Sequence, residues 1–101
     1  MRSELEVLFR NDVVLVRLMA LQANEVSPKH YHTQLLESVI CVDGEIMAFT
    51  SEKVAPVVLA PGQSVSFPPL HVHWLENNGD SMAKYVLTQS GGAYDFCEVE
   101  G

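Results

Sequence analysis

The sequence predicts an all-β domain, an antiparallel β-barrel of jelly-roll type. Its apolar residues run in short stretches that favour strands, and turn residues interrupt them roughly every eight to twelve positions. They do not recur with helical spacing over any long window. With 101 residues, 48% of them hydrophobic and 19% charged, the chain has the length and apolar content of one small domain, which we expect to span residues 1–101.

The expected strands follow one another between turn signals. Eight or so short strands of this kind are typical of a barrel or a sandwich. The strands are expected at Leu5–Phe9, Val13–Leu21, Leu35–Val42, Glu45–Phe49, Val57–Ala60, Ser64–Phe67, His71–Glu76 and Ala83–Gln89. The turns are expected at Asn11-Asp12, Asp43-Gly44, Pro61-Gly62, Pro68-Pro69 and Asn77-Asn78-Gly79-Asp80. The pair Gly91-Gly92 is expected to loosen a short C-terminal tail, Tyr94–Gly101.

One turn predicts a register. Asp43-Gly44 lies between two apolar stretches and favours a two-residue type I′ hairpin turn, because Gly adopts positive φ freely and Asp tolerates it better than most residues. In the register that this turn would set, the facing pairs are Val42 with Glu45, Cys41 with Ile46, Val39 with Ala48 and Glu37 with Thr50.

Charge and cysteine content argue against several classes of protein. Six Lys and Arg against thirteen Asp and Glu give a formal net charge of -7, which disfavours a nucleic acid partner gripped through its phosphates. No apolar run approaches the ~18–20 residues of a membrane span, and Met1–Arg10 lacks the pattern of a secretory signal. Cys41 and Cys97 are too few for a disulfide scaffold. We therefore expect a soluble cytoplasmic protein with two reduced thiols and no membrane partner.

Three histidines and one glutamate are the candidate metal ligands. In an extended His30-Tyr31-His32 segment alternate side chains share a face, so both imidazoles point to one region. Glu37 on the following strand can return to that region, and His73 comes far along the chain. Imidazole with carboxylate suits a divalent transition metal (Fe, Mn, Ni, Cu or Zn), whereas Ca²⁺ and Mg²⁺ prefer oxygen ligands alone. The sequence does not choose among these metals.

At these residues the sequence resembles the cupin superfamily. The first cupin motif has a glycine, five residues, His-x-His, three or four residues, Glu, six residues and a closing Gly. This chain has His30-x-His32, four residues, Glu37, six residues and Gly44. Asn24 stands at the position of the first glycine, and Asn also tolerates left-handed backbone.

The second cupin motif has a glycine, five residues, Pro-x-Gly, two residues, His, three residues and Asn. It matches Gly62, Pro68-Pro69-Leu70, His73 and Asn77, except that Leu70 replaces the glycine of a tight turn. Pro68-Pro69 could form that turn without the glycine. The fold is therefore expected to be the same, and only the backbone path just before His73 is left open. The two motifs together imply a cupin barrel with the metal ion inside it, toward one mouth, held by His30, His32, Glu37 and His73.

Several further residues have two interpretations each. His71 could be an alternative metal ligand, but His73 fits the motif spacing. Arg17 could bind a carboxylate in the pocket, although an ion pair or a position at a strand edge is more common for such an arginine. Cys41, on the face of Glu37, is interpreted as packing in the barrel floor rather than as a nucleophile. Trp74 alternates with His73 and is expected to point away from the metal site.

The resemblance to small cupins implies a metal-dependent enzyme acting on a small oxygenated or anionic organic molecule. Dioxygenase-like chemistry is placed slightly ahead of lyase or isomerase chemistry, in which the metal ion acts as a Lewis acid. The alternative is a non-enzymatic module that binds a small molecule or a metal for sensing or storage. No catalytic residue beyond the metal ligands is predicted.

The hairpin register also predicts a homodimer. It would place Ile40, Val42, Met47 and Phe49 together on the outside of the barrel, and Val13–Leu21 is apolar on both faces. Large exposed apolar patches usually mark an interface, and homo-oligomers most often close as two-fold dimers. Dimers are also what the resemblance to small cupins implies. The alternative is that the N-terminal strand or the C-terminal tail folds back over the patch.

Overall fold

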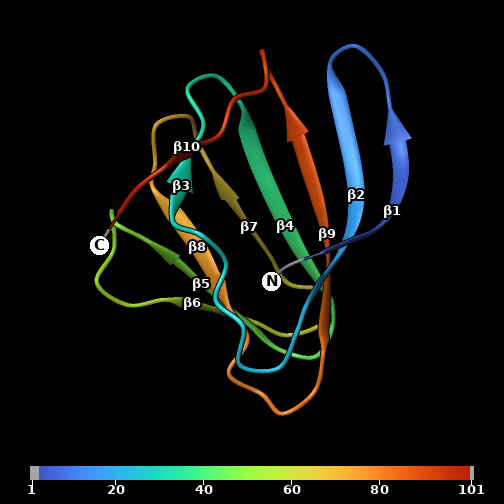
Figure 1. Cartoon of the computed structure of the whole chain (residues 1–101), viewed down its shortest axis with the longest axis vertical. Helices are drawn as coiled ribbons and strands as arrows, with labels where there is room; N and C mark the ends of the chain where they lie inside the picture. The colour runs from blue at the N-terminus through green and yellow to red at the C-terminus, as the bar shows by residue number, and fades with distance from the viewer. Residues whose placement is uncertain (1–2, 101) are drawn as a thin grey trace.

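The described part of the chain, residues 3–100 of the computed structural model, folds into ten strands in two five-stranded sheets that face each other (Figure 1). The first sheet contains β1 (Ser3–Arg10), β2 (Val14–Leu21), β9 (Ala83–Ser90), β4 (Leu36–Asp43) and β7 (Ser64–Phe67), in that order. The second contains β10 (Cys97–Glu98), β3 (His30–Tyr31), β8 (His73–Glu76), β5 (Ile46–Thr50) and β6 (Val57–Leu59), in that order. The prediction of an all-β jelly roll is confirmed.

All eight expected strands are present, and no end is shifted by more than two residues. The largest shift at a start is in β1, which begins at Ser3, and in β8, which begins at His73. The two short strands β3 and β10 were not expected, because two residues are too few to show alternation. The described residues form no helix of the length and apolarity that crossing a membrane requires. Residues 1–2 and 101 of the predicted domain lie outside the described residues.

The predicted hairpin at Asp43-Gly44 is wrong. β4 pairs with β7 and β9, whereas β5 pairs with β6 and β8, so the chain passes from one sheet to the other between these strands. Gly44 does adopt a positive φ of 80°, and a Cβ built there would lie 3.1 Å from the Cβ of Ala83. The glycine is therefore needed for a close contact at a crossing between sheets, not for a hairpin turn.

The predicted facing pairs are replaced by pairs with other strands. The observed partners are Phe67 and Gln89 for Glu37, Val65 and Leu87 for Val39, Tyr85 for Cys41, Leu59 for Ile46, Val57 and Leu75 for Ala48, and His73 for Thr50. No such pair joins Val42 with Glu45 in the described strands. Glu37, Val39, Cys41, Ile46 and Ala48 are nevertheless buried, as expected, because both strands line one interior from opposite sheets.

The same crossing divides the predicted dimer patch. Ile40 and Val42 lie on the first sheet, with 40% and 47% of their surface exposed, whereas Met47 and Phe49 belong to the second sheet. Phe49 stacks on Trp74 at 5.1 Å between ring centroids. The single patch that the hairpin would have created is therefore absent.

One half of the barrel interior is apolar, and we call this half the floor. Its side chains come from both sheets and are almost fully buried, so the hydrophobic effect stabilises the fold there. The floor consists of Met19, Leu21, Val39, Cys41, Ile46, Ala48, Leu59, Leu75, Ala83, Tyr85 and Leu87, and Phe67 extends the same apolar cluster toward the other end of the interior, where its ring stacks on His73. Cys41 is 1% exposed within this cluster, so the interpretation of Cys41 as a packing residue is confirmed.

The other end of the barrel interior, which we call the mouth, is polar. On the first sheet one row of directly paired residues crosses it, from Leu15 through Gln89 and Glu37 to Phe67. On the second sheet His73 pairs directly with His30. The segment after β9 crosses the mouth from the first sheet to the second before it enters β10 (Figure 1). The C-terminal tail is therefore held against the barrel, and β10 pairs with β3.

Candidate metal centre

His30, His32, Glu37 and His73 meet inside the mouth. One ligand atom from each residue lies within 4.8 Å of the ligand atoms of the others. All four residues are 2% exposed or less. His30 comes from β3 and His32 from the loop that follows it, whereas Glu37 lies at the start of β4 and His73 at the start of β8. The expectation that Glu37 returns to the two imidazoles is met.

Backbone carbonyl groups orient all three imidazoles. Nδ1 of His30 donates to the carbonyl of Pro28 at 2.8 Å, and Nδ1 of His73 donates to the carbonyl of His71 at 2.9 Å. Nδ1 of His32 donates to the carbonyl of Asp95. A carbonyl oxygen can only accept, so each Nδ1 carries a hydrogen. In the neutral imidazoles the lone pair is therefore on Nε2, the nitrogen that faces the centre of the cluster.

Glu37 has a close polar contact at each of its carboxylate oxygens, and an imidazole donates there only when Nε2 as well as Nδ1 carries a hydrogen. Nε2 of His32 lies 3.0 Å from Oε1, and Nε2 of His73 lies 2.6 Å from Oε2. Burial alone would raise the pKa of Glu37, but these hydrogen bonds outweigh it and hold the pKa well below its usual range. Glu37 is therefore a carboxylate at neutral pH.

The same contacts act on His32 in the opposite direction. Burial would lower the pKa of His32, but the hydrogen bonds with Glu37 and with the Asp95 carbonyl together raise it above the ordinary value. A proton on Nε2 of His32 is thus hydrogen-bonded to the carboxylate of Glu37. A metal ion that takes this place has to displace that proton.

The C-terminal tail supplies walls that the sequence did not reveal. The ring of Phe96 stacks on His30 at 4.3 Å between centroids, and Tyr94 lies 5.9 Å from His32. The carboxylate of Asp95 accepts hydrogen bonds from the backbone and the hydroxyl of Thr33, which secures the tail over the mouth. These residues carry no motif, and only the tertiary fold brings them to the site.

Gln89 and Arg17 extend the cluster along the first sheet. Nε2 of Gln89 donates to Oε1 of Glu37 at 2.9 Å, and Nη2 of Arg17 donates to Oε1 of Gln89 at 3.0 Å. Arg17 also lies 3.5 Å from Glu4, so the ion pair anticipated for Arg17 is present. Gln89 was not predicted, although its alternation with the buried Leu87 and Tyr85 signals an inward position on β9.

The remaining residues with two interpretations lie outside the cluster. Among the described residues, the group that could hold a metal ion does not include His71. His71 lies instead at a separate cavity between β5, β6 and β7. Trp74 stacks on Phe49 and its Nε1 donates to Glu76, so it points away from the cluster as expected. Cys41 and Cys97 are free thiols.

Asn24 and Leu70 occupy the two positions where the cupin motifs have glycine. Their φ angles are 61° and 72°, and in the described residues they alone among non-glycine residues have positive φ. The amide of His71 donates to the carbonyl of Pro68 at 3.3 Å, which closes a turn with Leu70 at its third position. The prolines do not replace the glycine conformation, and Leu70 adopts it at a cost.

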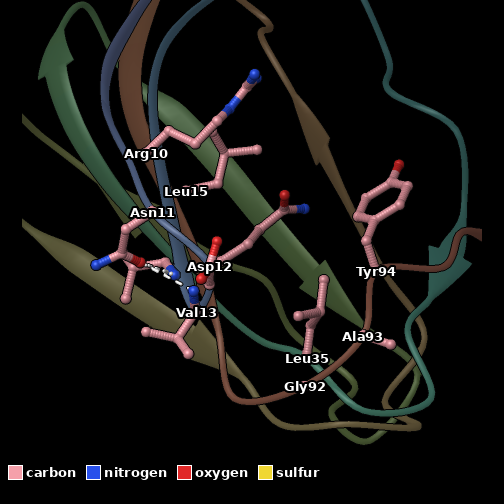
Figure 2. Close-up of a pocket in the computed structure, with 11 residues that line it drawn as sticks. Arg10, Asn11, Asp12, Val13, Leu15, Leu35, Gly92, Ala93 and Tyr94 are labelled. Atoms are coloured by element: carbon pink, nitrogen blue, oxygen red, sulfur yellow. Dashed lines mark hydrogen bonds between the residues drawn. The ribbon is translucent and has the colours of Figure 1, made fainter.

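A cavity of about 320 Å³ lies beside the cluster, between the β1–β2 turn and the C-terminal tail. Figure 2 shows Tyr94 across this cavity from Arg10, Asn11 and Leu15. Gln89 also lines the cavity, and it contacts Glu37 directly, so one side chain connects the cavity to the cluster. The volume falls at the lower end of the ~300–1,000 Å³ typical of small-molecule sites.

Comparison with solved structures places the fold among known barrels. An uncharacterized conserved protein with a double-stranded β-helix domain from Klebsiella pneumoniae is 17% identical, with a TM-score of 0.84 over 99% of this chain and 85% of that chain. A cupin superfamily sugar phosphate isomerase from Silicibacter pomeroyi is 22% identical, with a TM-score of 0.70 over 80% of this chain and 52% of that chain. Oxalate oxidase in complex with the substrate analogue glycolate is 18% identical, with a TM-score of 0.76 over 85% of this chain and 46% of that chain.

These likenesses establish the fold alone, since the identities are low and the chain spans only about half the length of the isomerase and the oxidase. No curated protein sequence matches the chain. The family model described as "Cupin domain" matches residues 17–88, which contain both motifs and all four residues of the cluster. The chain therefore belongs to the cupin family.

Proposed function

We propose that His30, His32, Glu37 and His73 bind one divalent transition metal ion: Fe, Mn, Ni, Cu or Zn. The observation that carries the proposal is the set of three Nδ1 hydrogen bonds to backbone carbonyls, which turns three Nε2 atoms toward one carboxylate. Ligating histidines in metalloproteins are typically oriented in this way. The mixed nitrogen and oxygen set suits these metals better than Ca²⁺ or Mg²⁺.

We further propose that the protein is an enzyme acting on a small oxygenated or anionic organic molecule. Three neutral imidazoles and one carboxylate leave a divalent ion with a net charge near +1, which favours anionic ligands. The bound metal would supply either oxygen activation or Lewis-acid polarisation of a carbonyl or carboxylate group. The cavity of about 320 Å³ beside Gln89 has room for such a molecule. The named activities of the solved neighbours, oxalate oxidation and sugar phosphate isomerisation, are of both kinds.

We propose dioxygenase-like chemistry in preference to lyase or isomerase chemistry. Measuring oxygen uptake with an oxygen electrode distinguishes the two. Protein purified without added metal is analysed for its metal content, reloaded with that metal, and supplied with small hydroxy acids, dicarboxylates and sugar phosphates. Oxygen uptake that depends on both metal and substrate supports the oxygenase. Substrate conversion without uptake supports the lyase or isomerase.

One observation favours the alternative, a non-enzymatic module that binds a metal or a metabolite. The cluster offers four protein ligands, which is enough to fill a tetrahedral site, whereas catalytic zinc sites usually have three protein ligands and keep one coordination position open. In that case the protein retains its metal during dialysis against chelator and consumes none of the substrates.

The ligand set itself is tested by substitution. His32→Ala and Glu37→Ala should each lower metal occupancy sharply, because each removes one ligand of a four-ligand site. His71→Ala is the matched control, since its imidazole lies outside the cluster. Elemental analysis of the purified variants measures the occupancy. Unchanged occupancy in both His32→Ala and His73→Ala would sink the assignment.

We also propose a homodimer, formed through the outer face of the first sheet. There Ile40, Val86 and Leu18 are direct neighbours across β4, β9 and β2, and Val16 follows on β2. None of the four is buried within one chain. An apolar row on an outer sheet face favours contact with the same row of a second copy. A cytoplasmic location is proposed as well, since it suits the two free thiols.

Light scattering tests the dimer. Leu18→Lys combined with Ile40→Glu should convert it to a monomer, because charges would be buried at the interface. Met47→Glu, on the second sheet, serves as the control and should leave the dimer intact. A wild-type chain that is strictly monomeric at micromolar concentration contradicts this proposal.

A further inference from the structure

Gln89 stands between two charged groups at the mouth. It is 4% exposed and pairs with Leu15 on one side and Glu37 on the other. Its Nε2 donates to Oε1 of Glu37 at 2.9 Å, and its Oε1 accepts from Nη2 of Arg17 at 3.0 Å. The side chain amide therefore connects the guanidinium of Arg17 with the carboxylate of Glu37.

Arg17 fixes the direction of this amide. A guanidinium has only donors and a carboxylate has only acceptors, so just one of the two amide orientations satisfies both neighbours. The flipped amide would place its NH₂ group against Arg17 and its oxygen against Glu37, and both contacts would be repulsive. Arg17 contacts Gln89 and not Glu37. By fixing the amide it nevertheless keeps the NH₂ group of Gln89 directed at Oε1 of Glu37.

This hydrogen bond survives metal binding, whereas those from the imidazoles do not. His32 and His73 contact Oε1 and Oε2 of Glu37 through Nε2, the same nitrogens that would bind a metal. Because Nδ1 already carries one hydrogen, Nε2 can donate to Glu37 only in the imidazolium form, and an imidazole whose Nε2 lone pair binds a metal has no hydrogen on that nitrogen. The amide of Gln89 remains a donor in either state, and it contacts Oε1 alone.

We propose that Gln89, oriented by Arg17, is a positioning residue that occupies Oε1 of Glu37 and leaves Oε2 as the oxygen available to the metal ion. This inference rests on the proposed metal centre. Partners of this kind usually contribute about 10- to 100-fold to metal affinity. The pair Arg17–Gln89 extends the metal site by two residues that neither cupin motif contains.

Co²⁺ is a suitable probe, because its affinity and its visible absorption spectrum report the ligand set separately from activity. Gln89→Leu, which keeps the approximate size and removes the donor, should weaken Co²⁺ binding about 10- to 100-fold and change the spectrum. Arg17→Met should weaken binding to a smaller degree, and Arg17→Lys should restore part of the loss. Glu4→Gln is the control, because it removes the exposed partner of Arg17 without touching the amide.

The double variant decides whether Arg17 acts through Gln89. In the Gln89→Leu background, Arg17→Met should have no further effect on Co²⁺ affinity, because the group that it orients is gone. Equal effects of Arg17→Met in both backgrounds would overturn the relay. Circular dichroism of each variant verifies folding, and Arg17 is partly exposed, so its variants keep the test available if Gln89→Leu does not fold.

The two proposals fail in different ways. If the wild-type chain binds no Co²⁺, the metal centre is overturned and the positioning role with it. If the wild-type chain binds Co²⁺ and Gln89→Leu binds it with the same affinity and spectrum, only the positioning role is overturned.

Discussion

The mouth and the floor of this barrel are built by the same strands but have opposite chemistry. β4 places Glu37 at the mouth and Cys41 in the floor, and β9 places Gln89 at the mouth and Tyr85 in the floor. Burying carboxylates and imidazoles costs free energy unless they are paired, whereas burying the floor residues stabilises the fold directly. The floor therefore supplies the stability, and the mouth can hold a polar cluster because the floor supports it.

Leu87→Ala should have the largest effect on stability and should leave metal binding at the mouth intact. Leu87 is fully buried in the floor, and truncating such a leucine costs about 2–5 kcal/mol of the free energy of unfolding. Urea denaturation measures this loss, and the outward-facing neighbour Thr88→Ala provides the control. The folded variant should still bind one metal ion per chain. A loss of metal binding without a loss of stability would contradict the division into floor and mouth.

Metal ions should reverse the pH dependence that the mouth confers. In metal-free protein the raised pKa of His32 gives a contribution to stability that is complete below about pH 6.5 and is lost as the pH rises through the folded-state value. The lowered pKa of Glu37 gives a contribution that persists throughout this range. The free energy of unfolding of the metal-free protein should therefore fall between about pH 6, close to the ordinary histidine pKa, and about pH 8.5.

With metal the slope should have the opposite sign, because protons compete for the same imidazoles. A metal concentration of about 100 Kd should add about 2.7 kcal/mol to the free energy of unfolding. Urea midpoints with chelator and with metal, measured across this interval, give both slopes. His32→Ala should flatten both curves, and metal-free stability that rises with pH in the wild type would refute the pairing of His32 with Glu37.

The smallest expected effect comes from the turn that leads into the mouth. Leu70 has a φ of 72°, a conformation that costs a non-glycine residue about 1–2 kcal/mol. Leu70→Gly should therefore stabilise the chain by about 0.5–1 kcal/mol, since glycine loses more backbone entropy on folding. Leu70→Ala keeps the strain and is the matched control. A thermal midpoint that falls in Leu70→Gly would show that the leucine side chain contributes more than its backbone costs.

Local patterns were enough to predict which residues point inward, but not which strands pair. Alternation placed Glu37, Val39 and Cys41 inside, and they are buried. The same alternation is expected whether the next strand pairs with β4 in a hairpin or faces β4 from the opposite sheet. The sequence therefore favoured a hairpin at Asp43-Gly44, whereas this turn connects the two sheets. The positive φ of Gly44 was expected correctly, and only its role differed.

The four cluster residues were predictable because two motifs carry them, and a motif keeps its spacing in the sequence. Their supporting groups were not, because they come from distant parts of the chain. Gln89 is 52 residues from Glu37, and Asp95 is 63 residues from His32. Asp95 contributes a backbone carbonyl to the imidazole, a group that every residue has, so its identity gives no signal.

These separations also impose an order in time. A ribosome delivers His30, His32 and Glu37 together, but His73 follows 36 residues after Glu37, and the carbonyl that orients His32 comes later still. A nascent chain thus offers three loose ligands before the fourth ligand and the tail exist, and contacts of such long range form slowly. A metal ion that bound to the emerging chain would therefore meet three ligands that are held less firmly than the four in the finished barrel.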